Sequence, residues 1–279
     1  MIRRQMPFLE KLTAVSRTRD SIVCVGLDPE PDRIPPSLGA GSTAAIAFLR
    51  DIVRATSDYV CAYKPNLAFY ERYGLEAFAI LAAVIDAIPD DIPVILDAKR
   101  GDVPNTAEAY ASALFDSFGA DAATVAPYLG MDAVAPFARD ERYALVVART
   151  SNPGARDLQD LLVDGRPLYE RFVSAAVAAF PAERCGFVVG ATYPEEAKRL
   201  RALAPDRLFL MPGVGAQGGD VATAIRAGLD ERGGGVLPSA SRSVIFASSG
   251  ADYERAAADA ARSLRDAANA ARATAMGRR

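Results

Sequence analysis

Acidic and basic side chains follow one short apolar run in a pattern suited to proton transfer. Asp97 and Lys99 come directly after the apolar residues Val-Ile-Leu, and Asp102 follows shortly after them. Residues two apart in a strand point to the same face, so the Asp97 and Lys99 side chains are expected to lie together. A charge beside a buried run is costly unless it is paired, so the two form either a structural ion pair or a site of acid–base chemistry.

Two other apolar runs also end in a charged residue. Asp28 follows the run at 22–27, and Lys64 follows the run at 59–63. A lone Asp–Lys pair would favour the structural interpretation. With further charges at the neighbouring strand ends, a catalytic cluster is the better hypothesis.

The composition restricts the chemistry that such a cluster can perform. The 279 residues contain no His, which excludes Ser-His-Asp hydrolysis, His-ligated zinc and phosphohistidine transfer. Carboxylates, lysines, tyrosines or cysteines must carry any acid–base step. The three cysteines lie scattered in apolar runs and are expected to be buried. A net charge of −3 predicts no nucleic-acid partner, and with no signal peptide or membrane span in view we expect a cytoplasmic protein.

Short, almost continuously apolar runs recur along the chain, and amphipathic segments separate them. Strands that are buried on both faces have this composition. The runs lie at 22–27, 59–63, 94–98, 122–126, 144–148, 187–191, 208–211 and within 235–247. Eight strand–helix units predict an α/β fold, a (β/α)8 TIM barrel formed as a single domain by residues 1–279. An open doubly wound sheet is the alternative.

Further helices are expected outside these units. An extra N-terminal helix that ends within 16–20 would cover the barrel floor, and an Ala-rich closing helix is expected from Asp252 to about Ala275. The segment 155–180 is longer than a usual connection and contains a turn, and it has no predicted function. One set of apolar residues keeps a single helical face: Leu75, Phe78, Ala82 and Ile85.

Glycines follow the seventh apolar run. The spacing Gly213-x-Gly215-x-x-Gly218 matches a dinucleotide-binding motif, but it does not open a βαβ unit and no acidic residue ends a following strand. Glycine backbone amides after strands seven and eight of a barrel commonly bind phosphate, and we expect that here. Arg242 can join this site if strand eight is 235–241, with 243–248 in the loop or turn after it. A strand at 243–248 would instead bring Arg242 to the opposite end of the barrel.

Taken together, these motifs resemble the orotidine 5′-phosphate decarboxylase family in its longer bacterial form (type 2). The residues from Asp97 to Asp102 are similar to the family's D-x-K-x-x-D signature, which some sugar-phosphate enzymes of the same superfamily share. The combination with further segments in the family's order is more specific than the signature alone. These segments are GLDP at 26–29, KPN at 64–66, RTSNPGA at 149–155 and PGVGAQGG at 212–219.

The resemblance implies an enzyme that converts orotidine 5′-monophosphate to UMP and CO2 in de novo pyrimidine biosynthesis. It implies a homodimer with shared active sites that uses no metal and no organic cofactor. Lys99 would donate the proton to C6, and Asp97 would face the substrate carboxylate. The other implied site residues are Asp28, Lys64 and Thr106 at the ribose hydroxyls, Asp102 and Thr106 supplied by the other subunit, Ser151 at the pyrimidine amide edge, and Pro212, Gln217 and Arg242 around the phosphate.

Two other functions remain open on the same barrel. In a metal-dependent sugar-phosphate lyase or aldolase, the carboxylates would bind Mg²⁺ and stabilise an enediolate. In a non-catalytic phosphosugar-binding barrel, the nucleotide would bind without turnover. The KPN and TSNPGA segments count against the first alternative, and the complete set of Asp97, Lys99 and Asp102 counts against the second.

Overall fold

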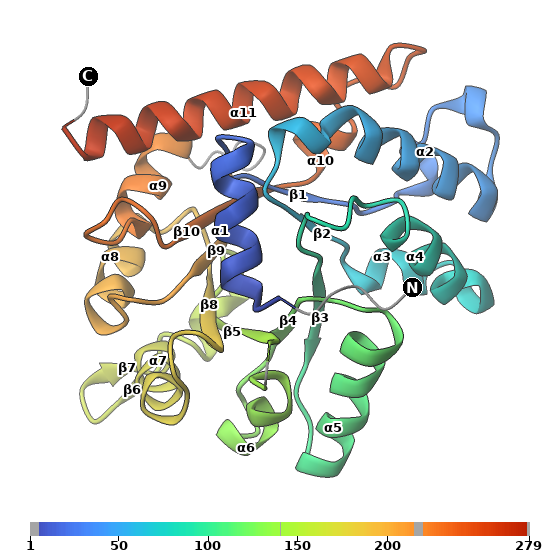
Figure 1. Ribbon diagram of the computed structural model, residues 1–279. Coiled ribbons are helices and arrows are strands. Elements are labelled where there is room, and N and C mark those ends of the chain that lie inside the picture. Colours follow the sequence, from blue (N-terminus) through green and yellow to red (C-terminus); the bar gives the residue numbers. More distant parts are fainter. Residues whose placement is uncertain (1–5, 140, 215–219, 278–279) are drawn as a thin grey trace.

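The computed structural model describes residues 6–139, 141–214 and 220–277, and its centre is a closed barrel (Figure 1). Eight parallel strands pair in the order β2-β1-β10-β9-β8-β5-β4-β3, and isolated bridges Tyr63↔Val94 and Asn66↔Asp97 join β2 to β3. The predicted barrel is confirmed, and the open sheet is wrong. The strands are β1 Cys24–Gly26, β2 Ala62–Lys64, β3 Ile95–Arg100, β4 Ala122–Val125, β5 Tyr143–Arg149, β8 Cys185–Val189, β9 Phe209–Pro212 and β10 Val236–Ala240.

The strands form because their residues can be buried on both faces. Every residue of β4, β8 and β10 is buried, as the almost continuously apolar runs predict. Strand β3 differs at its end, where Lys99 is exposed and Arg100 is half-buried. The polar residues therefore begin where the strands leave the core, at their carboxyl ends.

Helices surround the barrel and cover its outer face (Figure 1). Asn66 caps α3 by accepting from Ala68 N, and Asp220 caps α9 by accepting from the backbone N–H groups of Ala222 and Thr223. The helices are α2 Gly41–Thr56, α3 Leu67–Glu71, α4 Ala77–Ile85, α5 Pro104–Ser112, α6 Met131–Val134, α7 Leu168–Ala179, α8 Pro194–Leu203, α9 Val221–Gly228, α10 Arg242–Ile245 and the closing helix α11 Tyr253–Ala275. A π-helical turn at Ala113–Ser117 extends α5, and short 3-10 helices lie at Pro31–Arg33, Pro36–Leu38, Ser57–Tyr59, Gly74–Glu76, Ala135–Phe137 and Pro153–Asp157.

The N-terminal helix α1, Phe8–Thr18, lies across the barrel floor, as predicted (Figure 1). The ring of Phe8 packs against that of Tyr143 with centroids 4.9 Å apart. Lys11 Nζ forms a buried ion pair with Asp121 Oδ2 at 2.9 Å, and the same carboxylate oxygen accepts from Val94 N at 2.8 Å. One carboxylate thus fastens α1 to the starts of both β3 and β4.

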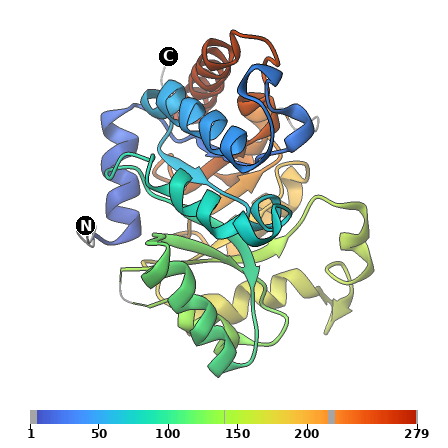
Figure 2. The same ribbon diagram turned by 90° about the vertical axis from the view of Figure 1, so that its right-hand side faces the viewer.

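The long connection after β5 forms a hairpin at the opposite end of the barrel from α1 (Figure 2). Its strands are β6 Leu162–Val163 and β7 Arg166–Pro167, and they pair antiparallel. Asp164 and Gly165 link them with φ values of 51° and 75°. Two successive residues with positive φ make the tight turn that suits the twist of a hairpin.

The apolar stripe expected on α4 is mostly exposed. Leu75 precedes the helix in a 3-10 turn and is fully exposed, and Phe78 is 58% exposed. The side that faces the core instead carries Ile80, Leu81 and Val84. All nine residues of α4 are apolar, so periodicity could not distinguish its buried side from its exposed side.

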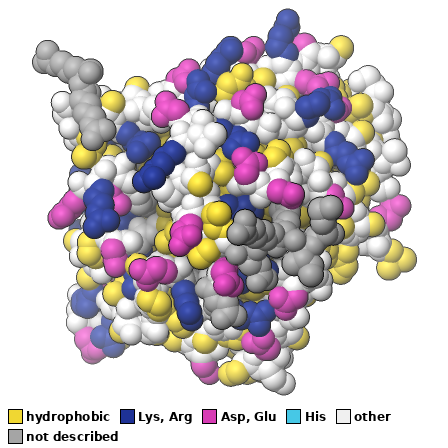
Figure 3. Space-filling model, viewed as in Figure 1, with side chains coloured by type: hydrophobic (Ala, Val, Ile, Leu, Met, Phe, Trp, Pro, Cys, Tyr) yellow, Lys and Arg dark blue, Asp and Glu magenta, His cyan; other side chains and the backbone are white. Residues whose placement is uncertain are grey.

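Charges of both signs are interspersed on the face shown in Figure 3, which fits the small net charge. None of the described helices is long and apolar enough to cross a membrane. Cys24, Cys61 and Cys185 are free and buried, as predicted. Burial raises the pKa of the Cys24 and Cys185 thiols to about 12, so both stay protonated at neutral pH.

Candidate active site

A cavity of about 540 Å³ opens at the carboxyl ends of the strands. This is the end at which barrel enzymes carry their catalytic residues. Residues predicted from the sequence supply much of its lining, namely Asp28, Lys64, Asp97, Lys99, Ser151, Pro212 and Arg242. Four further polar lining residues belong to the predicted KPN and RTSNPGA segments but had no predicted role: Asn66, Arg149, Thr150 and Asn152. Further polar lining residues outside these segments are Thr124, Ser239 and Ser241.

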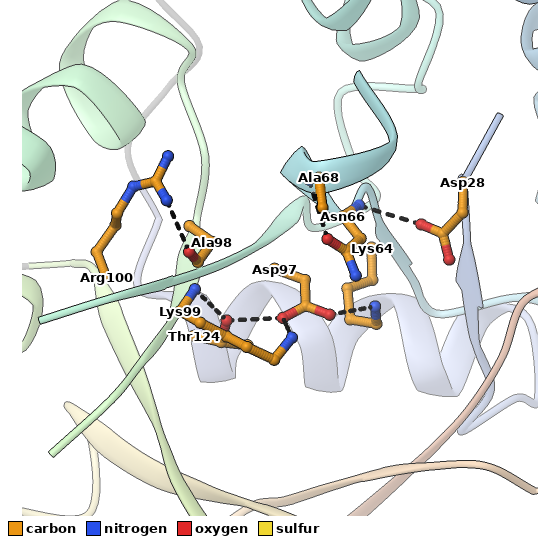
Figure 4. A network of polar contacts seen from close by, with 9 residues as sticks. All are labelled: Asp28, Lys64, Asn66, Ala68, Asp97, Ala98, Lys99, Arg100 and Thr124. Atoms are coloured by element: carbon orange, nitrogen blue, oxygen red, sulfur yellow. Dashed lines mark hydrogen bonds and ion pairs between the residues drawn. The ribbon is translucent and has the colours of Figure 1, made fainter. Parts of the chain in front are cut away.

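The Asp97 carboxylate lies between two lysines (Figure 4). Its Oδ2 accepts from Lys64 Nζ at 2.9 Å, and its Oδ1 accepts from Lys99 Nζ at 2.6 Å. Asp97 and Lys64 are buried, whereas the Lys99 side chain is 52% exposed. The geometry therefore fixes the carboxylate in place and leaves one of its two ammonium partners accessible from the cavity.

The charges in this cluster set each other's protonation. Burial alone would raise the pKa of Asp97, but the ammonium groups of Lys64 and Lys99 outweigh it and hold that pKa well below its usual value. Burial alone would lower the pKa of Lys64, but the carboxylates of Asp97 and Asp28 raise it overall. At neutral pH, Asp97 is therefore a carboxylate and Lys64 an ammonium.

Asp28 is a second buried carboxylate near Lys64, so that Asp28, Lys64 and Asp97 form a row of charges. Its Oδ1 accepts from Asn66 N at 3.1 Å (Figure 4). Burial raises the pKa of Asp28, and the nearby Lys64 ammonium opposes that rise without cancelling it. The buried row thus alternates in sign from Asp28 through Lys64 to Asp97.

Lys99 reaches this pair from an unusual backbone conformation. Its φ is 46°, and the β3–β4 register shifts between Leu96 and Arg100. The Asp97 and Lys99 side chains do lie together as expected. The prediction assumed the regular alternation of a β-strand, whereas in the structure the left-handed backbone of Lys99 brings them together. A non-glycine residue in that region is strained and needs surrounding contacts to hold it.

Thr124 on β4 provides such a contact, and the sequence analysis missed it. Its Oγ1 accepts from Lys99 N at 3.0 Å and donates to Asp97 Oδ1 at 2.8 Å (Figure 4). The residue is only 1% exposed. One hydroxyl therefore links the strained backbone to the carboxylate, and a single Thr inside an otherwise apolar run was the signal that could have revealed it.

The end of the cavity at which the sequence predicts a phosphate site follows strands β9 and β10. The eighth strand of the barrel is β10, within the predicted segment 235–241. This confirms that Arg242 lies at the carboxyl ends of the strands, where it lines the cavity. The segment expected as a loop or turn begins with a single helical turn, α10. Arg242 is exposed, and within the described residues its guanidinium makes no hydrogen bond or ion pair. Gln217 lies outside the described residues.

Asp102 and Thr106 do not line the cavity of their own chain. Asp102 Oδ1 accepts from Val103 N at 2.8 Å, and Thr106 Oγ1 donates to Asn105 Oδ1 at 3.5 Å. Both contacts are local to the start of α5. Their part in the site thus remains a prediction.

Comparisons with known proteins agree with this geometry. Residues 21–260 match the model of the "Orotidine 5'-phosphate decarboxylase / HUMPS family". The chain is 44% identical over 256 residues to the orotidine 5′-phosphate decarboxylase of Cupriavidus taiwanensis, covering 90% of this chain and 94% of the relative. It is 46% identical over 260 residues to that of a Roseiflexus species, covering 90% and 93%.

Solved structures show the same likeness. The OMP decarboxylase of Leishmania donovani superimposes with a TM-score of 0.85 at 39% identity, covering 96% of this chain and 99% of that one. A putative orotidine-monophosphate decarboxylase from Toxoplasma gondii gives 0.89 at 35% identity, covering 97% and 98%.

Proposed function

The chain belongs to the orotidine 5′-phosphate decarboxylase / HUMPS family, and we propose that its cavity converts orotidine 5′-monophosphate to UMP and CO2 in de novo pyrimidine biosynthesis. The observation that carries this assignment is the Lys99 ammonium, held at 2.6 Å from the Asp97 carboxylate and accessible from the cavity. The reaction's place in nucleotide synthesis is the reason to expect the enzyme in the cytoplasm.

The chemistry requires stabilisation of a localised negative charge. When the bond from C6 to the carboxyl carbon breaks, the electron pair stays on C6 in the plane of the ring. No adjacent carbonyl can accept it by conjugation. Enzymes lower barriers by roughly 8–23 kcal/mol, and here we propose that preorganised electrostatics supply this without metal or organic cofactor. The Lys99 ammonium stabilises the developing charge and then transfers a proton to C6.

Asp97 has two parts in this step. It fixes the Lys99 ammonium by a hydrogen bond, and as a buried anion it faces the carboxylate that leaves as CO2. Its lowered pKa keeps it ionised at neutral pH. Lys64 holds the other carboxylate oxygen, so Asp97 cannot turn away from the reacting group.

The remaining lining residues bind parts of the substrate that do not react. Asp28 and Lys64 hold ribose hydroxyls, and Ser151 contacts the pyrimidine amide edge. Pro212 and Arg242, with Gln217, surround the phosphate. The phosphate is remote from the breaking bond, so its binding energy can order the charged cluster and raise the rate as well as the affinity.

We also propose that the enzyme is a homodimer in which the second copy supplies Asp102 and Thr106. Three observations support this. Neither residue lines its own cavity. Large apolar side chains that follow the neighbouring strands β3 and β4 are exposed, with Val103 at 51% and Tyr128 at 71%. The Phe78 ring is also exposed, and it packs on Phe118 with 5.6 Å between the ring centroids.

The test is decarboxylation by the purified protein in EDTA, followed as the change in ultraviolet absorbance from substrate to UMP. Wild-type protein should turn over, and Lys99→Ala should lose at least about 10³-fold in kcat while it still binds UMP. The matched control is Lys198→Ala, a lysine on the exposed surface of α8.

Each alternative has its own outcome in this assay. Activity that disappears in EDTA would favour a metal-dependent sugar-phosphate lyase. UMP binding without turnover in the wild-type protein would favour a non-catalytic barrel. Near-normal turnover in Lys99→Ala would refute its part as proton donor.

A further inference from the structure

The segment between β5 and α7 reaches back to the strand end that carries Ser151. We propose that Gln159 in this segment is a positioning residue that holds the Thr150–Asn152 loop, and thereby Ser151, so that the site can read the pyrimidine. This inference rests on the proposed function and assigns a part in substrate recognition to a segment for which the sequence suggested none.

The Gln159 side chain makes three contacts with the strand end. Its Oε1 accepts from Thr150 N at 2.9 Å and from Arg149 Nη1 at 3.3 Å. Its Nε2 donates to Thr150 Oγ1 at 2.8 Å, and Thr150 Oγ1 donates in turn to Asn152 Oδ1 at 2.6 Å. A single amide group therefore ties down both the backbone and the side chain of the residue before Ser151.

Gln159 is itself held firmly. Its backbone N donates to Ala155 O at 2.8 Å, and its backbone O accepts from Tyr169 N at 3.1 Å in the first turn of α7. Leu168 N also donates to Leu161 O at 2.8 Å. The helix that packs on the barrel thus anchors the segment from which Gln159 extends.

The next residue along, Asp160, secures Arg149. Arg149 is 1% exposed and lines the cavity, and its guanidinium pairs with Asp160 at 3.2 Å. The same guanidinium lies 4.7 Å from the centre of the Tyr193 ring and donates to Thr150 O at 2.8 Å. Gln159 and Asp160 therefore hold Thr150 and Arg149, two successive residues at the end of β5.

Gly190 limits Ser151 from the other side. A Cβ added at Gly190 would lie 2.1 Å from Ser151 Oγ, so the hydroxyl occupies the space that a side chain there would need. Gly190 N donates to Arg149 O at 2.8 Å, which ties the end of β8 to that of β5. Ser151 therefore packs against Gly190 on one side and follows Thr150, which Gln159 holds, along the chain.

In the proposed complex, different parts of the barrel bind the base and the phosphate of the nucleotide. The Gln159 side-chain contacts all lie at the end of β5, whereas Pro212 is the last residue of β9 and Arg242 begins α10, shortly after β10. Loosening the β5 loop should therefore weaken ligands that carry the pyrimidine and spare ligands that carry only ribose and phosphate. A general loss of stability would weaken both.

The experiment compares UMP and ribose 5-phosphate by calorimetric titration of wild-type protein and Gln159→Ala. We expect UMP to bind about 10-fold more weakly to the variant, as for the loss of one or two hydrogen bonds, and ribose 5-phosphate to change by less than about twofold. The matched control is Leu162→Ala, an exposed residue of the same segment between β5 and α7, for which both affinities should match wild type.

Two further measurements keep the test independent of folding and of turnover. Gln159→Glu keeps the acceptor for Thr150 N, so its UMP affinity should fall by less than about threefold. Backbone hydrogen exchange of the peptide covering 149–152 should speed up in Gln159→Ala and stay unchanged in Leu162→Ala. If Gln159→Ala does not fold, Asp160→Asn should show the same preferential loss of UMP.

The outcomes separate this inference from the proposed function. Unchanged UMP affinity in Gln159→Ala, or an equal loss of UMP and ribose 5-phosphate, would overturn the positioning role while wild-type turnover leaves the enzyme assignment intact. Wild-type protein that neither binds UMP nor decarboxylates the substrate would overturn both.

Discussion

At the scale of single residues, the site depends on the Asp97 carboxylate, which several side chains hold in place. Asp97 accepts hydrogen bonds from Lys64, Lys99 and Thr124. A buried charge with this many partners remains ionised and hardly moves. Such preorganisation is what a reaction without an electron sink needs, since nothing has to reorient when the charge develops.

Thr124 should affect the rate more than binding. Thr124→Val has nearly the same shape but leaves Lys99 N without its acceptor and Asp97 without one donor, so we expect kcat to fall by about 10- to 100-fold. Steady-state kinetics should show a much smaller change in KM. Thr124→Ser, which keeps the hydroxyl, should recover most of the rate. Wild-type kcat in the Val variant would show that Lys99 keeps its position without this contact.

The lowered pKa of Asp97 should also appear in the stability of the protein. A carboxylate with a depressed pKa contributes stability that is complete above the ordinary pKa of about 3.9 and is lost as the pH falls below it, at up to about 1.4 kcal/mol per pH unit. Asp97→Asn should therefore flatten the decline in unfolding free energy on the acid side. Urea unfolding between about pH 3 and about pH 7 measures this, and parallel curves would contradict it.

Sequence alone predicts the charged residues of this site better than its neutral ones. Asp28, Lys64, Asp97 and Lys99 stand at the ends of apolar runs, and a charge there is costly enough to imply a purpose. Thr124 lies inside such a run, where a buried Thr is commonly a structural residue of the core, so its position does not indicate a part in the site. The left-handed backbone of Lys99 leaves no trace in the sequence, since it coincides with a register shift between two strands that are separate in the chain.

At the scale of elements, the strands were predictable and one helix face was not. Strands buried on both sides need continuous apolar runs, and each of the eight runs contains or overlaps a strand of the barrel. In α4 every residue is apolar, so the sequence does not distinguish core from surface. Phe78 therefore lies on the exposed side of α4, although its residue type would suit the core equally well.

Arg242 gives an element-level prediction, since its position depends on which segment forms strand eight. Arg242→Ala should weaken UMP by at least ~1.5–3 kcal/mol, the usual contribution of a hydrogen bond to a charged group. Uridine, which has no phosphate, should bind the variant and the wild-type protein equally. Arg255→Ala on the exposed surface of α11 is the control. Unchanged UMP affinity would mean that the phosphate lies elsewhere.

At the scale of the whole molecule, the proposed dimer makes each cavity a joint product of two chains. Inactive Lys99→Ala and Asp102→Ala proteins, mixed and allowed to exchange subunits, should regain up to roughly a quarter of wild-type activity, because half of the dimers are hybrids and one site in each is intact. Turnover before and after mixing measures this. Exchange that is demonstrated by mass but restores no activity would place Asp102 outside the partner's site.

The ion pair beneath the barrel constrains the order in which the molecule can be assembled. Lys11 and Asp121 are 110 residues apart in sequence. A ribosome must therefore produce the first three strands and Asp121 before the opening helix has this anchor. Until then the apolar side of that helix, with Phe8, Leu12 and Val15, lacks the partner that fastens it to the barrel. Docking of the first helix must therefore wait until Asp121 has been made, and the apolar side of the helix stays uncovered until then.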